Sequence, residues 1–578
     1  MQKLIVLRLV IAFTLAGQLL PSAAFAASAT IQTDNGNQQF RDQVVLYVRQ
    51  AAAHTILNAP APSGETLDEK WNRGYQTIDW SVHITIYRQG SQVGEGSAHG
   101  AGLADSLQAA TESSLSSAAM LIAGKDDFDQ LRFRVTFDYF PAHKYSFIEY
   151  RGRGIELLGN RVTVREIDTG SVKQQINDSL HYLLGVMHPE LHGFYRFYDA
   201  GLDQHEASLR TVYSASSLYT LLKLYQLDHD PELEKNFRPI AGFILSRQLK
   251  DGPNTGGFYY SYNPETEKNL CVVVTGTASK TIFTLIELNA LYRDDPQYLQ
   301  AARNAADWLL TMIMPDGRVN PLASCTSGSW QNEHKQSFLY SGQVLSALSR
   351  LYAVTHDQRY LDGATLVARH FANEVARQGL LVGDGYRPAN SISSSWILMS
   401  LIDYSGINSE PEYRDLVHRL ASMLVSRQIK NPEDAYNDGR YLDAMTSSGN
   451  GWINEVMGRF YAFCMEENST DCRPYRQAII ASSRWLLQNA YNRVNTYDIK
   501  NPGRASGGFI YNFRSKTVRT DAVCHGLNSL MSLLKITGDE KNVLLALQER
   551  PLIEILPLLR SGPGNDTSTG FGDTTLPE

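Results

Sequence analysis

Beyond residue 170 the hydrophobic positions follow a helical period. The stretch 338–352 is typical, because apolar residues such as Phe338, Leu345 and Leu348 recur there at spacings that fit one helix face. Small residues, among them Gly342, occupy positions between them, which indicates that neighbouring helices approach closely. We therefore predict a buried helix that begins directly after the polar segment 331–337.

This unit of a polar loop and an apolar helix recurs about six times between residues 172 and 540. One arm of each unit opens with acidic residues or proline, as at Asp230 and Asp295, which are helix start signals. The other arm is richer in small and apolar residues, as expected for an inner helix packed on both sides. These inner arms begin near Ala207, Gly276, Ser337, Ser393, Gly451 and Thr520.

The links between the arms are unequal in length. Long links rich in Gly, Asn, Asp and aromatic residues precede the inner arms, at about 189–206, 250–275, 314–336, 379–390, 430–447 and 491–519. Loops of this length in a compact domain are usually functional. Six helical hairpins with all long loops on one face form an (α/α)6 toroid, with a pit at the N-termini of the inner helices. A last helix at 543–558 is predicted to close the ring.

An open solenoid, such as a TPR or HEAT array, is the alternative arrangement of helical pairs. Such arrays keep a fixed period of roughly 34 to 47 residues. The inner arms here are about 50 to 70 residues apart, and their loops are long and aromatic. The spacing therefore favours the closed toroid.

The N-terminal part of the chain has a different pattern. A helix is predicted at about 40–53 and another at about 104–122, with alternating strands at 80–87 and 131–137, a turn at 94–96 and a hairpin at 148–165. The fold class is therefore mainly α, with an α+β domain at 40–169 before a toroid domain at 170–560. The segments 27–39 and 561–578 are predicted to be a disordered linker and tail.

The first 26 residues have the pattern of a secretory signal peptide. Lys3 and Arg8 form the basic end, an apolar run follows at 9–20, and Ala24-Phe25-Ala26 fits a cleavage site. The apolar run is short for a membrane span, and no later segment reaches the needed length. We expect a periplasmic or secreted protein without a membrane span.

Composition narrows the function further. The 578 residues carry a formal net charge of −7 without a basic block, which disfavours nucleic-acid binding. Among the five cysteines, Cys464 with Cys472 and Cys271 with Cys325 are possible disulfides, and Cys524 is left over. No spacing indicates a metal site, a phosphate loop or a nucleophile elbow, so we predict no metal and no cofactor.

The repeat and its loops resemble the six-hairpin glycosidase-like superfamily, over about residues 172–540. This superfamily includes N-acylglucosamine 2-epimerases, unsaturated glucuronyl hydrolases and the C-terminal domain of D-glucuronyl C5-epimerases. The resemblance is one of architecture and repeat texture, and it does not select one family. It implies carbohydrate chemistry in the pit.

Glycosidic cleavage needs two carboxyl groups, and epimerisation or elimination needs an acid and a base. The catalytic candidates are acids at the pit-facing loops and first turns of inner helices: Glu333, Asp443 and Asp521. An acid favoured by a helix dipole is the stronger explanation of Glu333, and an ordinary N-cap residue with a histidine nearby explains Asp521 equally well. The remaining acidic candidates in the long loops are also explained as ordinary solvated loop residues without a catalytic role.

Further polar and aromatic residues lie at the same ends of the inner arms. Glu455, on a mainly buried helix, needs a partner, so it either faces the pit or is neutralised by Arg459. Asp521 and His525 share one helix face, with Arg519 beside them. The predicted substrate-binding residues are Arg210, Tyr213, Tyr259, Trp330, His334, Trp452, Glu455, Arg519 and His525.

These observations lead to two hypotheses. The first is an exported carbohydrate-active enzyme: a glycoside hydrolase, a lyase or an epimerase. Its substrate would be an oligo- or polysaccharide, either neutral or uronate-containing. The second is a non-catalytic glycan-binding or polysaccharide-assembly protein on the same toroid. The partner in both is a carbohydrate, and the sequence leaves the oligomeric state open.

Overall fold

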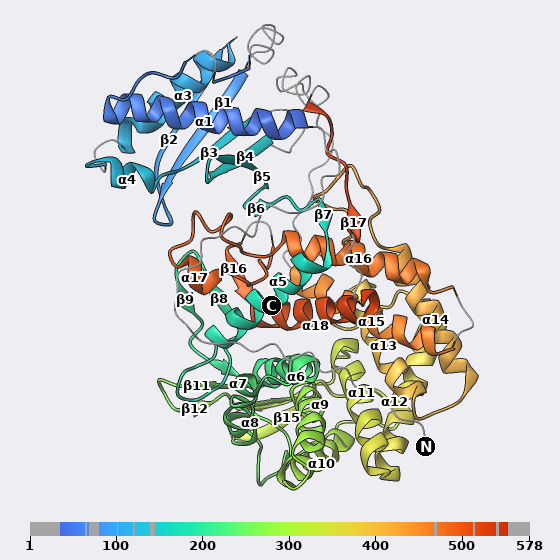
Figure 1. Ribbon diagram of the computed structural model, residues 1–578. Helices are drawn as coiled ribbons and strands as arrows, with labels where there is room; N and C mark the ends of the chain where they lie inside the picture. Colours follow the sequence, from blue (N-terminus) through green and yellow to red (C-terminus); the bar gives the residue numbers. More distant parts are fainter. Residues whose placement is uncertain are drawn as a thin grey trace, which may run out of the picture.

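The computed structural model describes residues 35–63, 66–68, 80–100, 102–118, 122–138, 145–326, 328–467, 471–512, 515–538 and 543–552. They form an N-terminal α+β domain and a larger helical ring (Figure 1). The predicted signal peptide, most of the predicted linker and the tail lie outside the described residues.

The N-terminal domain is built on an antiparallel sheet with two long helices on one face. The strand order is β2-β1-β3-β4-β5-β6. The strands are β1 (Trp80–Arg88), β2 (Ser91–Gly100), β3 (Arg132–Phe137), β4 (Tyr145–Tyr150), β5 (Arg153–Leu158) and β6 (Arg161–Val162). The helices α1 (Asn35–Leu57) and α3 (Leu103–Ala118) cover the sheet, and α4 (Lys125–Asp129) is short. Phe40, Trp80 and Phe137 pack together between helix and sheet.

The predicted turn at 94–96 is wrong, because Gly94 and Gly96 lie inside β2 and the chain turns at Gln89-Gly90. These glycines allow α3 to pack directly on the strand. A Cβ atom on Gly94 would lie 2.2 Å from the carbonyl oxygen of Ser114, and one on Gly96 2.3 Å from the nitrogen of Ser114. The glycines therefore mark close approach of a helix, not a turn.

Six inner helices form the ring. They are α6 (Thr211–Asp228), α9 (Thr275–Leu291), α11 (Phe338–Thr355), α13 (Ser391–Ser405), α15 (Ser447–Glu467) and α18 (Thr520–Thr537). Each contacts the next, and α18 contacts α6, so the ring is closed. This closure confirms the (α/α)6 toroid and excludes the open solenoid.

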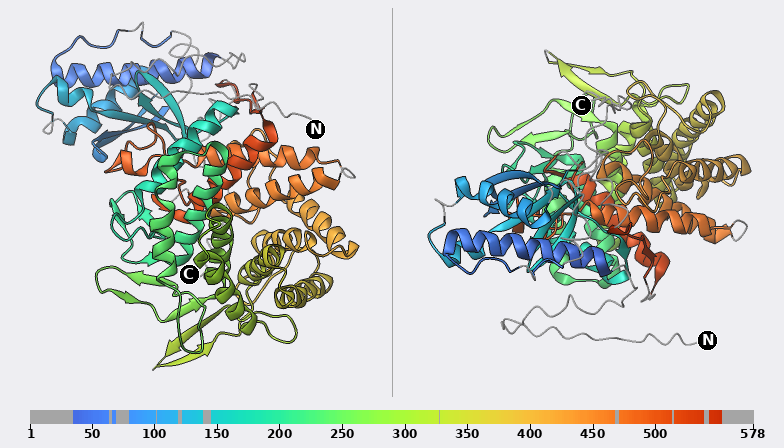
Figure 2. Two further views of the ribbon diagram at one scale, coloured as in Figure 1. Left: turned by 60° about the horizontal axis from the view of Figure 1, so that its bottom comes forward. Right: turned by 90° about the horizontal axis from the view of Figure 1, so that it is seen from above.

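Six outer helices surround this ring (Figures 1 and 2). They are α5 (Thr169–Gly185), α8 (Phe237–Leu245), α10 (Gln297–Thr311), α12 (Gln358–Gln378), α14 (Pro411–Ser426) and α16 (Arg473–Gln488), with two short helices, α7 (Pro231–Glu234) and α17 (Pro502–Ala505). Each outer helix packs on an inner one, α5 on α18. One continuous hydrophobic cluster fills the space between the two rings.

Short strands in the long loops were not predicted. They form three small sheets: β8 (Phe197–Asp199) with β9 (Gln204–His205) and β16 (Thr517–Arg519); β10 (Leu209–Arg210) with β11 (Ser261–Asn263) and β12 (Lys268–Asn269); and β13 (Val272–Val274) with β14 (Leu322–Thr326) and β15 (Ser329–Asn332). Strands of two to five residues are too short to show an alternating pattern. β10, β13 and β16 lead directly into α6, α9 and α18, so these sheets fix where those helices begin.

Both disulfide pairings suggested by the sequence are present. Cys271–Cys325 joins the residue before β13 to β14 across a Cα distance of 5.5 Å, and Cys464–Cys472 joins α15 to the start of α16 across 6.2 Å. Cys524 is free and buried in α18. Among the described residues no helix is long and apolar enough to cross a membrane.

The predicted closing helix at 543–558 is wrong over its described part. Residues Leu545–Ala546 form β17, which pairs with β7 (Glu166–Ile167). The chain then returns to the N-terminal domain, where Asn37 exchanges hydrogen bonds with the backbone of Arg550 and Leu552. The ring closes through α18 without this segment.

The N-terminal domain packs against the loop that leads into α18. The ring of Tyr87, on the sheet face away from α1 and α3, meets Tyr497 edge-on at 4.7 Å, and Arg134 donates to the Tyr497 hydroxyl at 3.1 Å. Figure 1 shows this domain above the part of the ring that contains α17 and β16. The domain thus supports the loop 491–519, which carries β16 to the ring.

Candidate active site in the centre of the ring

Water reaches the centre of the ring. Lys223 on α6 and Asp521 on α18 keep 23% and 22% of their side chains exposed, although they lie on inner helices enclosed by the outer ones. We infer that solvent reaches these positions along the ring axis. Three depths can be distinguished along this axis: the helix starts, the second turn, and the third and fourth turns.

A buried carboxylate and a histidine meet in the centre. The Oε2 atom of Glu455 on α15 lies 2.8 Å from Nδ1 of His525 on α18, and Oε1 accepts from Asn528 at 3.0 Å. Nζ of Lys223 lies 3.7 Å from Oε1. Burial acts to raise the pKa of Glu455, but the hydrogen bond from His525 and the nearby lysines outweigh it and lower the pKa to about 2.

This contact decides how His525 is oriented. An ionised carboxylate only accepts hydrogen bonds, so Nδ1 of His525 carries the hydrogen. In the neutral ring Nε2 then holds the lone pair. Nε2 has no hydrogen-bond partner among the described residues and is not sealed by protein atoms. The imidazole is therefore positioned to accept a proton from a molecule in the ring centre.

Lys280 lies at the same depth as His525, in the second turn of α9. Below its ammonium the indoles of Trp396 and Trp452 are stacked at 3.6 Å, and Nζ lies 5.0 and 5.2 Å from their centroids. The ring of Trp452 also meets His525 at 5.1 Å. Lys280 is partly exposed and has no carboxylate within ion-pair distance among the described residues, and burial lowers its pKa.

A third polar group occupies the deeper turns. Arg350 on α11 donates to Asp403 on α13 at 2.8 Å and to the hydroxyl of Tyr219 at 3.1 Å. Nζ of Lys223 lies 4.3 Å from the centroid of Tyr219. Burial acts to raise the pKa of Tyr219, but Lys223 and Arg350 outweigh it, so the pKa is lowered. The polar network therefore runs from His525 through Glu455 to Arg350.

Matched ion pairs lie at the helix starts, which we call the mouth of the ring. β16 delivers Arg519 to the start of α18, where Nε and Nη2 contact both carboxylate oxygens of Asp521 at 3.0 and 2.9 Å. Arg519 also donates to Tyr213, and Ser448 to Asp521. Burial opposes ionisation of Asp521, but Arg519 outweighs it and lowers the pKa. Arg210 forms an equivalent pair with Glu206 at 2.7 Å.

The three predicted catalytic acids are not joined by any hydrogen bond or ion pair. Glu333 is exposed, and its carboxylate accepts the backbone N–H groups of His334 and Lys335. Asp443 accepts the backbone N–H of Ser391 at the start of α13 and lies 3.4 Å from Arg427. Their catalytic role stays a prediction.

The other predicted binding residues divide between the rim and the ring. His334 pairs with Asn320, Trp330 lies on β15, and Tyr259 is half-buried in a loop. Trp452 is 4% exposed, so little of it is open to a ligand. Glu455 faces the centre, and its partners are His525, Asn528 and Lys223; Arg459 instead lies 3.4 Å from Asp403.

Several central residues were missed by sequence reasoning: Tyr219, Lys223, Lys280, Arg350, Trp396, Asp403 and Asn528. The sequence does contain a signal for two of them. Lys280 is the single charge in the first three turns of α9, and Asp403 the single charge in α13. An isolated charge on an otherwise apolar helix needs a partner or a function, the argument that had been applied to Glu455 alone.

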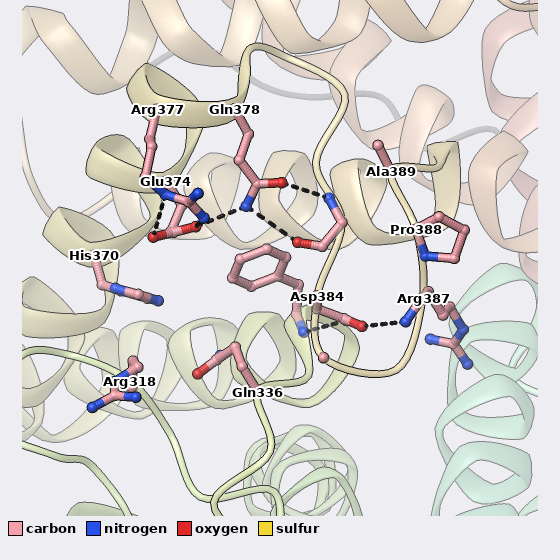
Figure 3. A pocket seen from close by; sticks show the side chains of 13 residues that line it. Arg318, Gln336, His370, Glu374, Arg377, Gln378, Asp384, Arg387, Pro388 and Ala389 are labelled. Atoms are coloured by element: carbon pink, nitrogen blue, oxygen red, sulfur yellow. Dashed lines mark hydrogen bonds and ion pairs between the residues drawn. The ribbon is translucent and has the colours of Figure 1, made fainter.

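A separate cavity of about 510 Å³ lies between α12 and the loop that leads into α13 (Figure 3). Asp384 in this loop accepts the backbone N–H of Phe338 and thereby caps α11, and Gln378 and Gly383 exchange two hydrogen bonds. Glu374 pairs with Arg377 at the same end of α12. Most of these polar groups hold the loop in place. Among the described residues, no group of three or more His, Cys, Asp or Glu side chains could hold a metal ion.

Similarity to known proteins is found among solved structures. No protein-family model and no curated protein matches the chain. Solved structures that it resembles include a cellobiose 2-epimerase from Bacillus thermoamylovorans (13% identity, TM-score 0.48, covering 63% of this chain and 98% of that one) and an α-mannanase from Bacteroides thetaiotaomicron (11%, 0.49, 64% and 97%). An unsaturated glucuronyl hydrolase specific for heparin is a third (12%, 0.46, 64% and 98%).

Proposed function

We propose that this protein is a carbohydrate-active enzyme that moves a proton at a sugar carbon, as an epimerase or a lyase does. The observation that carries the proposal is His525, whose Nδ1 is held by the ionised Glu455 while Nε2 has no hydrogen-bond partner among the described residues. A carboxylate behind an imidazole fixes its tautomer and stabilises the imidazolium that forms.

In the proposed reaction, Nε2 of His525 takes a proton from a carbon next to a carbonyl or carboxyl group of the sugar. The electron pair of the broken C–H bond is delocalised into that group, giving an enolate-like intermediate. In an epimerase a proton then returns to the opposite face of the carbon. In a lyase the pair forms a double bond and expels the oxygen substituent of the adjacent carbon.

The return of the proton to the opposite face needs a second donor. Tyr219 is a candidate, because its hydroxyl accepts a hydrogen bond from Arg350 and retains its own hydrogen. Lys223 and Arg350 lower its pKa, which makes proton release easier than from an ordinary tyrosine. Tyr219 is partly exposed on α6, in the third turn.

The carboxylates Glu455, in the centre, and Asp521, at the mouth, support proton transfer better than hydrolysis. A glycosidase needs one carboxyl group with a raised pKa to protonate the leaving oxygen. Here the pKa of Glu455 is lowered to about 2, and Arg519 lowers that of Asp521. Both are held ionised, so neither has the character of a general acid.

We also propose that the mature protein acts outside the cytoplasm. The N-terminal signal pattern supports this, and so do the disulfides Cys271–Cys325 and Cys464–Cys472, because disulfides persist in oxidising compartments. Fractionation of the producing cell, with the mature N-terminus determined by mass spectrometry, would test it.

The function is tested by incubating residues 27–578 with neutral and uronate-containing oligosaccharides in D2O. Deuterium bound to carbon without a change of linkage indicates epimerisation, and fragments that lack one water indicate elimination. His525→Asn should lower either rate by about 10²–10⁴-fold. The matched control is His181→Asn, because His181 is an exposed histidine on α5.

Other outcomes would contradict the proposal. Fragments that carry an added water would show a hydrolase. Unchanged turnover in His525→Asn would place the chemistry elsewhere. Glycan binding without any product at long times would show the non-catalytic alternative.

A further inference from the structure

Four ion pairs hold charged side chains at the mouth and in the centre of the ring, and Lys280 belongs to none of them. Arg519 pairs with Asp521, Arg350 with Asp403, and Lys223 with Glu455; at the start of α6, Arg210 pairs with Glu206. Lys280 has no carboxylate within ion-pair distance among the described residues. A lysine that approaches the core is normally paired, because an uncompensated charge is costly to remove from water.

Aromatic rings surround this ammonium, and Glu455 acts on it electrostatically without an ion pair. The indoles of Trp396 and Trp452 form the wall beneath it, and Phe283 contributes a third ring, whose centroid is 5.5 Å from Nζ. These rings attract a cation weakly through their faces but supply no negative charge. The side of Lys280 that faces the ring centre is therefore free for an anion.

We propose that Lys280 binds the carboxylate of an acidic sugar, so that the substrate class of the site is a uronate-containing glycan. This inference rests on the proposed function for the location of the site. The charge of the ligand is inferred independently, from Lys280. His525 and Lys280 both lie in the second turn of their helices, and both approach Trp452. A sugar that reaches both would present its carboxylate to Lys280 and a ring carbon to His525.

The pairing would also serve the chemistry. A hydrogen on the carbon next to a carboxylate is hard to remove, because the negative charge of the intermediate accumulates on an already charged group. An ammonium on that carboxylate offsets the developing charge. Lys280 would then assist the proton transfer that we assign to His525.

The test is a binding measurement. Isothermal titration calorimetry of residues 27–578 would compare oligogalacturonate and oligoglucuronate tetramers with the same tetramers after reduction of their carboxyl groups. We expect the wild-type protein to prefer an acidic tetramer by at least about tenfold in Kd, the effect of one charged hydrogen bond. Lys280→Met should remove this preference, and Lys250→Met, which changes an exposed lysine after α8, should keep it.

The outcomes are separable from those of the proposed function. Equal binding of acidic and neutral tetramers, or no binding of either at millimolar concentration, would overturn the acidic-sugar inference, and so would an unchanged preference in Lys280→Met. A retained preference without any turnover would reject the proton-transfer function and keep the ligand. Turnover of neutral sugars without a preference for acidic tetramers would support the proton-transfer function and overturn the acidic-sugar inference.

Discussion

Two groups of charged side chains on the inner helices differ in how completely they are paired. At the mouth, Arg519 and Asp521 satisfy each other through two hydrogen bonds. In the centre, Glu455 is surrounded by Lys223, His525 and Asn528, while Lys280 has no carboxylate and Nε2 of His525 has no partner among the described residues.

The difference separates structural from chemical roles. A matched pair gains its energy in the resting protein and has little left for a ligand. An unmatched group keeps its interaction for whatever enters, and evolution tolerates its cost where function requires it. This contrast is why we place the chemistry at His525 and Lys280 and not at Arg519–Asp521.

The largest expected effect on stability distinguishes the charged group in the centre from the one at the mouth. Glu455→Gln removes a carboxylate that is 4% exposed and leaves Lys223 without its counter-ion, so we expect a loss of about 3–5 kcal/mol. Asp521→Asn, at the more open mouth, should cost about 1–3 kcal/mol. Urea unfolding at pH 7, followed by circular dichroism, measures both. Equal losses would show that the centre is not the more demanding environment.

Acid should weaken the protein through the same carboxylate. The pKa of Glu455 is lowered from 4.5 to about 2 in the folded protein, so the stabilisation is present above pH 4.5 and is lost as the pH falls toward 2. The contribution at neutral pH is about 3 kcal/mol. Unfolding free energies of wild type and Glu455→Gln, measured from pH 7 to pH 3, should therefore converge. A constant difference would contradict the lowered pKa.

Lys280→Met should have the opposite effect on the free energy of unfolding, which should not fall. The substitution removes an unpaired, partly buried ammonium and leaves an apolar side chain against Trp396 and Trp452. We expect a melting temperature that is unchanged or higher by a few degrees, about 1 kcal/mol or less. Differential scanning calorimetry without ligand measures this. A clearly lower melting temperature would show that Lys280 supports the fold.

The architecture was predictable because it depends on repeated, long signals. Each inner helix shows its apolar period over four or more turns, and long loops precede the inner helices, so both the helices and the toroid followed from the pattern. Signals of one or two residues were read less well. Gly94 and Gly96 predict a turn but allow close packing of a helix, and the segment predicted as a closing helix contains the two-residue strand β17.

The centre of the ring was harder to predict because its contacts join distant segments. Lys223 and Glu455 are far apart in sequence, and only closure of the ring brings α6, α15 and α18 together. Aligning the inner helices by their starts would have placed Lys280, Trp396, Trp452 and His525 at one depth. Asp521 is in an ion pair and Lys280 is not. This difference depends on side-chain geometry, which cannot be read from the spacing of residues in the sequence.

The smallest effect is expected for Glu333→Gln. The carboxylate is exposed, and it accepts hydrogen bonds only from backbone N–H groups within its own loop, which the amide oxygen of glutamine can also accept. We expect a stability change within about 0.5 kcal/mol and an unchanged rate in the D2O assay. The rate decides between the two interpretations of this residue. A large loss of turnover in a folded Glu333→Gln protein would move the catalytic site from the ring centre to the β14–β15 hairpin, and would leave His525 and Lys280 as binding groups only.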